Sequence, residues 1–146
     1  MNTKLTEKKT YDVLIVGNGI AGMYGALQFD KDTSVLLLAK YGKDVSNSNL
    51  AQGGIAAVTS QDDDPEIHKS DTLIAGRGLC EDHSVDILVN EGPDRIAEII
   101  AEGMAFDSKN GVLALGLEGG HHKRRILHAG GDSTGRWITE FVISKV

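Results

Sequence analysis

Several residue types and patterns are scarce in this chain of 146 residues, and each shortage excludes a class of protein. Cys80 is the only cysteine, so an internal disulfide is impossible and a reducing compartment fits the chain. No apolar run is long enough to cross a bilayer, and no small-residue cleavage pattern follows the short run at 13–16. We therefore expect a cytoplasmic protein without a membrane span or a targeting segment.

Positive charge is also in short supply, because 15 Lys and Arg face 21 Asp and Glu, for a formal net charge of −6. This balance argues against a general nucleic-acid binder and against a protein that binds membrane surfaces. The basic run at 121–125 is too short and too isolated in an acidic chain to change that conclusion. Hydrophobic residues make up 40% of the chain and aromatic residues 5%, which suits a single globular domain.

A convincing set of metal ligands is missing as well. His121, His122 and His128 lie close in sequence, but no cysteine or suitably spaced carboxylate completes a tetrahedral set, and the neighbouring basic residues would repel a cation. The acidic run 62–64 lacks the ligand spacing of a calcium loop. We expect no metal site, and we expect 62–64 to be solvated surface that also caps a helix.

Glycine, in contrast, is abundant at 18 residues, many of them in pairs, as loops that approach a ligand require. Segments 13–16 and 35–39 are short β-branched and leucine-rich runs, typical of strands buried on both faces. We expect segment 21–29 between them to be a helix, which makes the three a βαβ unit with a parallel sheet.

The remaining sequence is expected to be mostly loop and helix. Residues 40–60 show no periodicity and indicate a long loop of the kind that carries function. One helix should begin after Asp64, run to about Ala75, and be followed by two helices over 83–91 and 93–103 that a Gly-Pro pair separates. An Asn-Gly pair within 105–115 predicts a hairpin.

The turn after the first strand carries the dinucleotide-binding fingerprint Gly17-Asn18-Gly19-Ile20-Ala21-Gly22. Its three glycines allow a tight turn, a close approach to a pyrophosphate, and close packing of helix on strand. The acid that would bind a ribose hydroxyl about twenty residues later is missing, since Ala39 and Lys40 stand there. This departure disfavours NAD, and Lys40 is either a contact to the adenosine half of another dinucleotide or a solvated lysine.

The segment 47–54 favours a flavin over a nicotinamide. It reads Asn47-Ser48-Asn49-Leu50-Ala51-Gln52-Gly53-Gly54, so it offers hydroxyl, amide and backbone donors without bulk. Such a loop can lie flat against a flavin ring and place donors near N5 and the pyrimidine oxygens. The two motifs together predict an α/β, Rossmann-like FAD-binding domain with a βαβ start of the glutathione-reductase type, in an FAD-dependent oxidoreductase.

Four blocks of the sequence resemble the L-aspartate oxidases of the succinate dehydrogenase/fumarate reductase flavoprotein family. They are 17–22, 48–58, 71–76, and 118–129 together with 132–136, and the similarity extends over nearly all of the chain from Tyr11 onward. Block 118–129 is the most specific to L-aspartate oxidases. The resemblance, together with the fingerprint, assigns these residues to FAD binding: Gly17, Asn18, Gly19, Ile20, Ala21, Gly22, Lys40, Asn47, Ser48, Asn49, Leu50, Ala51, Gln52, Gly53 and Gly54.

Two positions are informative within this resemblance. Membrane-bound relatives carry a histidine that links covalently to the flavin where this chain has Asn47, so the resemblance implies non-covalent FAD. Glu118 stands where dicarboxylate-reducing relatives carry an apolar residue, and an acid there can bind the ammonium of aspartate and repel an extra carboxylate. Glu118 is the expected substrate-binding residue, and some of the basic groups at 121–125 are expected to hold an anionic substrate or the flavin.

The resemblance implies oxidation of L-aspartate to iminoaspartate by hydride transfer from the α-carbon to flavin N5. Oxygen or fumarate would then reoxidise the flavin, and quinolinate synthase would use the imine in NAD biosynthesis. Two alternatives stay open. A soluble fumarate reductase or succinate dehydrogenase flavoprotein is disfavoured by Glu118 and Asn47, and a non-catalytic FAD-binding module is the other.

The chain is expected to be the N-terminal part of a longer protein. Segment 137–146 has helical spacing of apolar residues but no capping glycine or proline, and only two parallel strands are visible where a doubly wound sheet needs more. We expect residues 1–10 to be a polar tail and 11–146 to be part of the FAD-binding domain, without the capping domain or the remaining sheet. The family's catalytic arginine lies outside this chain, so no catalytic residue is expected here, and the chain alone should bind FAD poorly and not oxidise aspartate.

Overall fold

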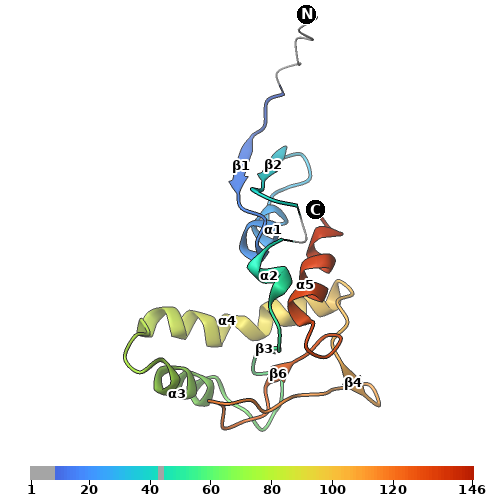
Figure 1. Ribbon diagram of the computed structural model, residues 1–146. Helices are drawn as coiled ribbons and strands as arrows, with labels where there is room; N and C mark the ends of the chain where they lie inside the picture. The colour runs from blue at the N-terminus through green and yellow to red at the C-terminus, as the bar shows by residue number, and fades with distance from the viewer. Residues whose placement is uncertain (1–8, 43–44) are drawn as a thin grey trace, which may run out of the picture. The chain divides into compact units, whose positions relative to one another are not determined.

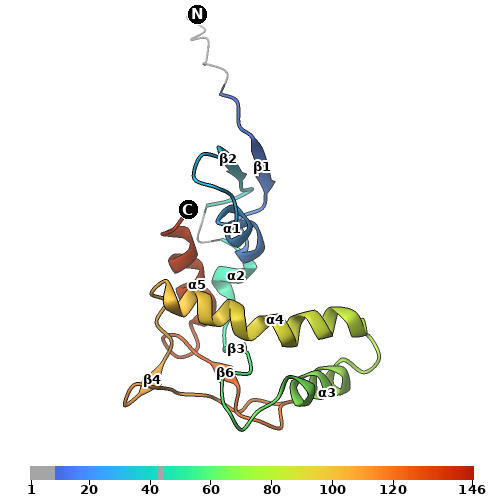
Figure 2. The same ribbon diagram turned by 180° about the vertical axis from the view of Figure 1, so that it is seen from behind.

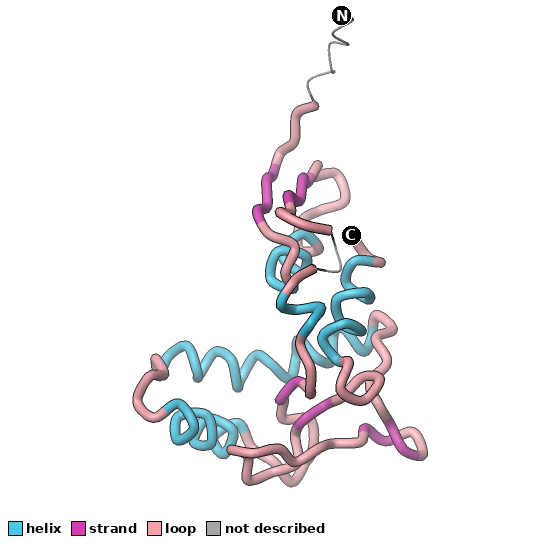
Figure 3. Tube along the Cα trace, viewed as in Figure 1, coloured by secondary structure: helices cyan, strands magenta, loops and turns pink. Residues whose placement is uncertain are grey.

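The computed structural model describes residues 9–42 and 45–146, so most of the expected tail lies outside the described residues. It divides the chain into two compact units, whose elements are labelled in Figure 1 and coloured by type in Figure 3. Unit 1 consists of the described parts of 1–50 together with 139–146, and unit 2 consists of 51–138.

Unit 1 contains the expected βαβ arrangement. Strands β1 (Val13–Val16) and β2 (Val35–Leu38) are parallel and pair in register from Val13 with Val35 to Val16 with Leu38. Helix α1 (Ile20–Ala26) connects them but ends three residues before its expected end at 29. The N–H of Gln28 bonds to the carbonyl of Gly25, a tightened i to i−3 bond that closes the last turn.

Segment 40–60 is not the featureless loop that its lack of periodicity predicts. The short helix α2 (Asn47–Leu50) begins after Ser46, whose hydroxyl accepts a hydrogen bond from the N–H of Asn49 at 3.1 Å. Strand β3 (Ile55–Ala56) pairs antiparallel with β6 (Ile126–Leu127). Local periodicity cannot reveal this strand, because its partner is about seventy residues away and each strand has two residues.

Helix α3 (Pro65–Gly76) begins and ends close to its expected limits. The carboxylate of Asp64 accepts a hydrogen bond from the N–H of Glu66 at 2.8 Å, and Pro65 occupies the first turn, where its missing N–H costs nothing. Arg77 then adopts a left-handed conformation that ends the helix.

Helix α4 (Asp82–Ala101) corrects the expected pair of helices, because it runs unbroken through Pro93 (Figures 1 and 2). The proline removes one intrahelical bond, at a cost of about 3 kcal/mol. Four buried side chains on the helix each contribute about 1.5–3 kcal/mol, which outweighs that cost. They are Val85, Val89, Ile96 and Ile99. Met104, which follows the helix, is also buried, whereas Ile100 is 37% exposed and lies outside the core.

Helices α3 and α4 lie side by side in unit 2, as both views of the chain show (Figures 1 and 2). The ammonium group of Lys69 on α3 lies 3.0 Å from the carboxylate of Asp82 and 2.7 Å from that of Asp86. The hydrogen bonds that Lys69 donates to Asp86 and Asp82 raise the pKa of Lys69.

The hairpin within 105–115 is confirmed. Strand β4 (Ser108–Lys109) pairs antiparallel with β5 (Val112–Leu113), with Asn110 and Gly111 as the two turn residues. Both have positive φ, 54° and 79°, as a type I′ turn requires.

Helix α5 (Thr134–Ile143) lies about three residues before the expected helix at 137–146. Thr134 fixes its start, because the hydroxyl accepts the N–H of Ala129 at 3.0 Å and donates to the carbonyl of Gly131. The apolar spacing that predicted this helix begins only at Trp137, so the polar first turn carried no signal. Among the described residues, no helix combines the length and the hydropathy that a bilayer crossing requires.

Candidate functional site

The fingerprint turn in unit 1 has the backbone geometry that its glycines predict. Gly17 has a φ of +114°, and its N–H donates to the carbonyl of Leu38 on the neighbouring strand at 2.8 Å. A Cβ atom at Gly22 would lie 2.1 Å from the carbonyl oxygen of Gly17, so only glycine fits there. Helix α1 therefore begins in close contact with the turn that follows β1. This is the arrangement that brings a helix N-terminus to a pyrophosphate.

Ser48 lies beside this turn, although 28 residues separate the two in sequence. Its hydroxyl oxygen accepts a hydrogen bond from the N–H of Ile20 at 2.9 Å and would lie 3.5 Å from a Cβ atom at Gly19. The side chain of Asn18 reaches the carbonyl of Gly42 at 3.4 Å. Unit 1 thus brings together the fingerprint and the first part of segment 47–54, and this glycine-lined turn fits the phosphate part of a dinucleotide.

Lys40 follows β2 and is exposed. Its ammonium lies 5.3 Å from the ring centre of Tyr41, a distance at which a cation–π attraction operates. The remaining assigned residues of the loop, Ala51 to Gly54, belong to unit 2.

Residues 51–54 are fixed against β6 within unit 2. Gly53 has a φ of +74°, a conformation that favours glycine. A Cβ atom at Gly54 would lie 2.4 Å from the side chain of Ile126 and 2.5 Å from the carbonyl oxygen of Leu127. The carbonyl of Ala51 accepts a hydrogen bond from Gly135 at 3.3 Å. The backbone conformation at Gly53 and the close packing at Gly54 therefore both favour glycine. As a result, this part of the loop carries no side chains at these two positions.

Glu118 lies next to this glycine pair. Both oxygens of its carboxylate lie 3.9 Å from the position that a Cβ atom would take at Gly53. One of them accepts a hydrogen bond from Nε2 of His128 at 2.9 Å. The Glu118 side chain is 48% exposed, and this hydrogen bond holds one of its oxygens. Sequence reasoning missed His128 as its partner, and the only signal was a polar residue directly after the apolar pair of β6.

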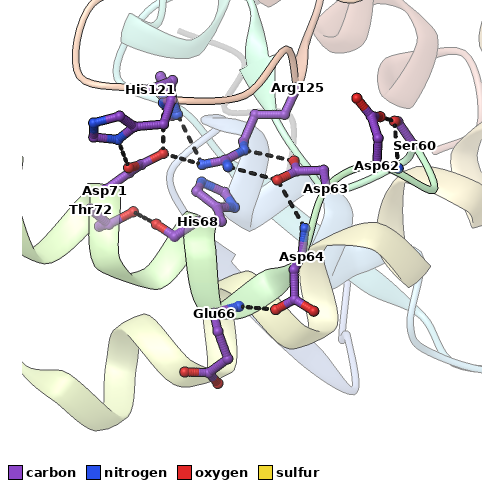
Figure 4. A network of polar contacts seen from close by, with 11 residues as sticks. Ser60, Asp62, Asp63, Asp64, Glu66, His68, Asp71, Thr72, His121 and Arg125 are labelled. Carbon is purple, nitrogen blue, oxygen red and sulfur yellow. Dashed lines mark hydrogen bonds and ion pairs between the residues drawn. The ribbon is translucent and has the colours of Figure 1, made fainter.

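A buried ion-pair network joins Arg125 to Asp63, just before α3, and to Asp71 within α3 (Figure 4). Arg125 is fully buried, and its guanidinium donates two hydrogen bonds of 2.8 Å to Asp63 and one of 2.8 Å to Asp71. The expectation that 62–64 is solvated surface is therefore wrong for Asp63, whose side chain is 1% exposed. Arg125 is likewise not available for an anionic substrate, because two aspartates already satisfy its buried charge.

Asp71 also holds the residues just after Glu118. It accepts the backbone N–H of His122 at 2.9 Å and contacts the Nδ1 atom of the same histidine. Burial by itself raises the pKa of Asp71, but the hydrogen bonds from His122 and Arg125 outweigh it and lower the pKa to about 2. Asp71 therefore stays ionised and keeps the loop attached to α3.

His68 completes the buried cluster beside Arg125. Its ring lies 5.7 Å from that of His121, and burial, followed by the charges of Arg125 and His121, lowers the pKa of His68. A neutral His68 suits a site that already holds a guanidinium. Within residues 9–42 and 45–146, no group of three or more histidine, cysteine or acidic residues is arranged to hold a metal ion.

A family profile described as "FAD binding domain" matches residues 12–146. The chain belongs to this family of FAD-binding domains. The expectation of a Rossmann-like FAD-binding fold is confirmed, and FAD is the cofactor that the family indicates.

Curated L-aspartate oxidases are among the relatives of this FAD-binding domain, as the resemblance predicts. It is 47% identical over 137 residues to the L-aspartate oxidase of Streptomyces coelicolor, covering 92% of this chain and 24% of that protein. It is 43% identical over 136 residues to the enzyme of Synechocystis sp., covering 93% and 24%. The chain therefore spans 24% of the length of both relatives.

Solved structures of flavoproteins share the fold of this FAD-binding domain. The structure of Mycobacterium smegmatis Sdh1 in complex with UQ1 has a TM-score of 0.84 at 29% identity, covering 96% of this chain and 24% of that chain. A variant of E. coli quinol fumarate reductase has a TM-score of 0.84 at 28% identity, covering 92% and 24%. The chain therefore shares its fold with the matching part of each of these two proteins.

Proposed function

We propose that residues 11–146 form the N-terminal part of the FAD-binding domain of an L-aspartate oxidase. The observation that carries this proposal is the position of Glu118, whose carboxylate lies beside Gly53 in the loop assigned to the flavin. A carboxylate there can accept a charge-assisted hydrogen bond from the ammonium group of an amino acid. The identities to L-aspartate oxidases support the same choice of substrate.

The FAD-binding residues divide into two groups by role. The fingerprint residues Gly17 to Gly22 and Lys40 serve the pyrophosphate and adenosine half, and Asn47 to Gly54 serve the flavin. The turn at Gly17 and the side-chain-free path at Gly53 and Gly54 support these roles. Asn47 is an amide and cannot form the covalent link that a histidine can, so the FAD is bound non-covalently.

The proposed reaction is the oxidation of L-aspartate to iminoaspartate. Bound FAD supplies the electron sink by accepting a hydride from the α-carbon, and oxygen or fumarate serves as the final acceptor. Glu118 binds the ammonium group of the substrate. By charge repulsion it disfavours a dicarboxylate that has no ammonium group. The imine product is then a substrate for quinolinate synthase in NAD biosynthesis. We place the protein in the cytoplasm, consistent with its single cysteine.

The test is Glu118→Gln in a full-length L-aspartate oxidase that carries this segment, called the full-length enzyme below. The variant removes the negative charge but keeps the shape, so aspartate oxidation should fall by about 10- to 100-fold, the loss expected for a hydrogen bond to a charged group. Fumarate reduction with an artificial electron donor should fall much less.

Glu91→Gln is the matched control, because Glu91 is an exposed glutamate on α4. It should leave both activities unchanged. Equal losses of aspartate oxidation and fumarate reduction in Glu118→Gln would remove Glu118 from the proposed role. Reduction of the FAD by succinate rather than L-aspartate would favour a fumarate reductase or succinate dehydrogenase, and no reduction by either would favour a non-catalytic module.

A further inference from the structure

His128 occupies a slot between two glycines in unit 2. A Cβ atom at Gly116 would lie 2.8 Å from Cε1 of the His128 ring, and one at Gly54 would lie 3.1 Å from its Cδ2. Any larger residue at either position would displace the imidazole. The two glycines therefore leave a space that the ring fills, with backbone on both sides.

The main chain around this slot is also held in place. The carbonyl of His128 accepts the N–H of Asp107 at 2.7 Å, and Gly116 exchanges two backbone hydrogen bonds with Ile126, at 2.8 and 3.2 Å. The preceding residue, Leu127, is buried in β6. The backbone of His128 and the plane of its imidazole ring are thus both restrained, and its Nε2 atom points to Glu118.

The hydrogen bond from Nε2 restrains a side chain that otherwise has many rotamers. Glu118 is 48% exposed, and a glutamate at that exposure loses conformational freedom when it must meet a ligand in one orientation. A donor that already holds one carboxylate oxygen reduces the conformational entropy that Glu118 loses on binding the substrate. The second oxygen keeps its lone pairs for the substrate ammonium. Unlike lysine or arginine, an imidazole has a form that donates such a bond without carrying a charge of its own.

We propose that His128 is a positioning residue that sets amino-acid specificity by holding the Glu118 carboxylate in the orientation that receives the substrate ammonium. This inference rests on the proposed function. It assigns no contact between His128 and the substrate, so its effect should appear only through Glu118.

The test compares His128→Leu, His128→Gln, Glu118→Gln and the double variant Glu118→Gln/His128→Leu in the full-length enzyme. His128→Leu should lower kcat/KM for L-aspartate by about tenfold, mainly through KM, with little change in fumarate reduction. His128→Gln keeps an N–H donor at similar reach and should recover most of that loss. In the Glu118→Gln background, His128→Leu should cause no further loss, because its partner charge is already gone.

The outcomes separate this inference from the function on which it rests. If Glu118→Gln affects aspartate oxidation selectively but His128→Leu does not, the role of His128 is wrong and the function stands. If Glu118→Gln is not selective, the function fails first. Losses that multiply in the double variant would mean that His128 acts independently of Glu118 and would overturn the proposal.

Gly116→Ala gives a second route that leaves the histidine in place. The added methyl group should push the imidazole out of line with Glu118, so the variant should lose aspartate oxidation selectively, as His128→Leu does. Gly92→Ala is its control, because a Cβ atom there meets nothing within 4 Å. Unchanged aspartate kinetics in a folded Gly116→Ala enzyme would contradict the positioning role.

Discussion

Arg125→Met is expected to destabilise the protein strongly, because it removes the only cation that the structure places against two buried aspartates among the described residues. Methionine matches the length of the arginine stem but removes the guanidinium from Asp63 and Asp71, although Asp71 keeps its contacts to His122. Removing one member of a buried ion pair typically costs about 3–5 kcal/mol, since the charge that remains is desolvated and unpaired. We expect the free energy of unfolding to fall by an amount in this range at neutral pH.

The pH dependence supplies a second signature of the same network. The pKa of Asp71 is lowered to about 2 in the folded state, below its value in an unfolded chain. A lowered pKa means that this stabilisation is present above about pH 4 and is lost as the pH falls towards 2. A shift of about two units corresponds to about 2–3 kcal/mol. Asp71→Asn should therefore flatten the loss of stability between pH 4 and pH 2.

The assay is urea denaturation followed by far-UV circular dichroism at a series of pH values, for the wild type and the two variants. Lys69→Met is the matched control, because it removes a cation that pairs with the more exposed carboxylates of Asp82 and Asp86. Because water still reaches these two carboxylates after the cation is removed, this control should lower stability much less than Arg125→Met. An Arg125→Met protein as stable as the Lys69→Met protein would refute the reasoning, and so would an unchanged acid profile in Asp71→Asn.

Two further predictions concern the first glycine turn and the long helix. Gly22→Ala should abolish FAD binding in the full-length enzyme, because the added Cβ would lie 2.1 Å from the Gly17 carbonyl oxygen. Flavin fluorescence measures this binding. Gly25→Ala is the control and should retain FAD binding, because a Cβ atom there meets nothing within 4 Å. Pro93→Ala should raise the melting temperature, because it restores a hydrogen bond inside α4. Alanine also makes the unfolded chain more flexible, which offsets part of the gain and leaves a net stabilisation of about 1–2 kcal/mol. A lower melting temperature would mean that the proline ring itself packs in the core.

The fold was predictable where a structural signal is local. The βαβ unit follows from two apolar runs around a glycine turn, the start of α3 from Asp64 before a proline, and the hairpin from one Asn-Gly pair. The split of α4 at Pro93 was predicted wrongly, because burial of one apolar face along its length outweighs a local breaker. Strand β3 was missed because its partner is distant in sequence.

The candidate site divides in the same way. The residues assigned to FAD and to the substrate were recognisable as motifs, since a glycine turn and an acid before a glycine pair are short patterns with definite spacing. Their neighbours were not. The acidic run at 62–64 and the basic run at 121–125 each resembled solvated surface, and only folding shows that Asp63 and Arg125 form a buried pair.

The amino-acid sequence alone was enough to identify the cofactor class, the family and the position of Glu118, because these depend on residue type and short spacing. Tertiary structure decided which charges are buried, that Arg125 pairs with two aspartates and is not available to an anionic substrate, and that the Glu118 carboxylate lies beside Gly53 in hydrogen-bond contact with His128. The physical reason is that a charge acquires its role from its partners and its distance from water. Both are set by contacts between residues that lie from ten to more than sixty positions apart.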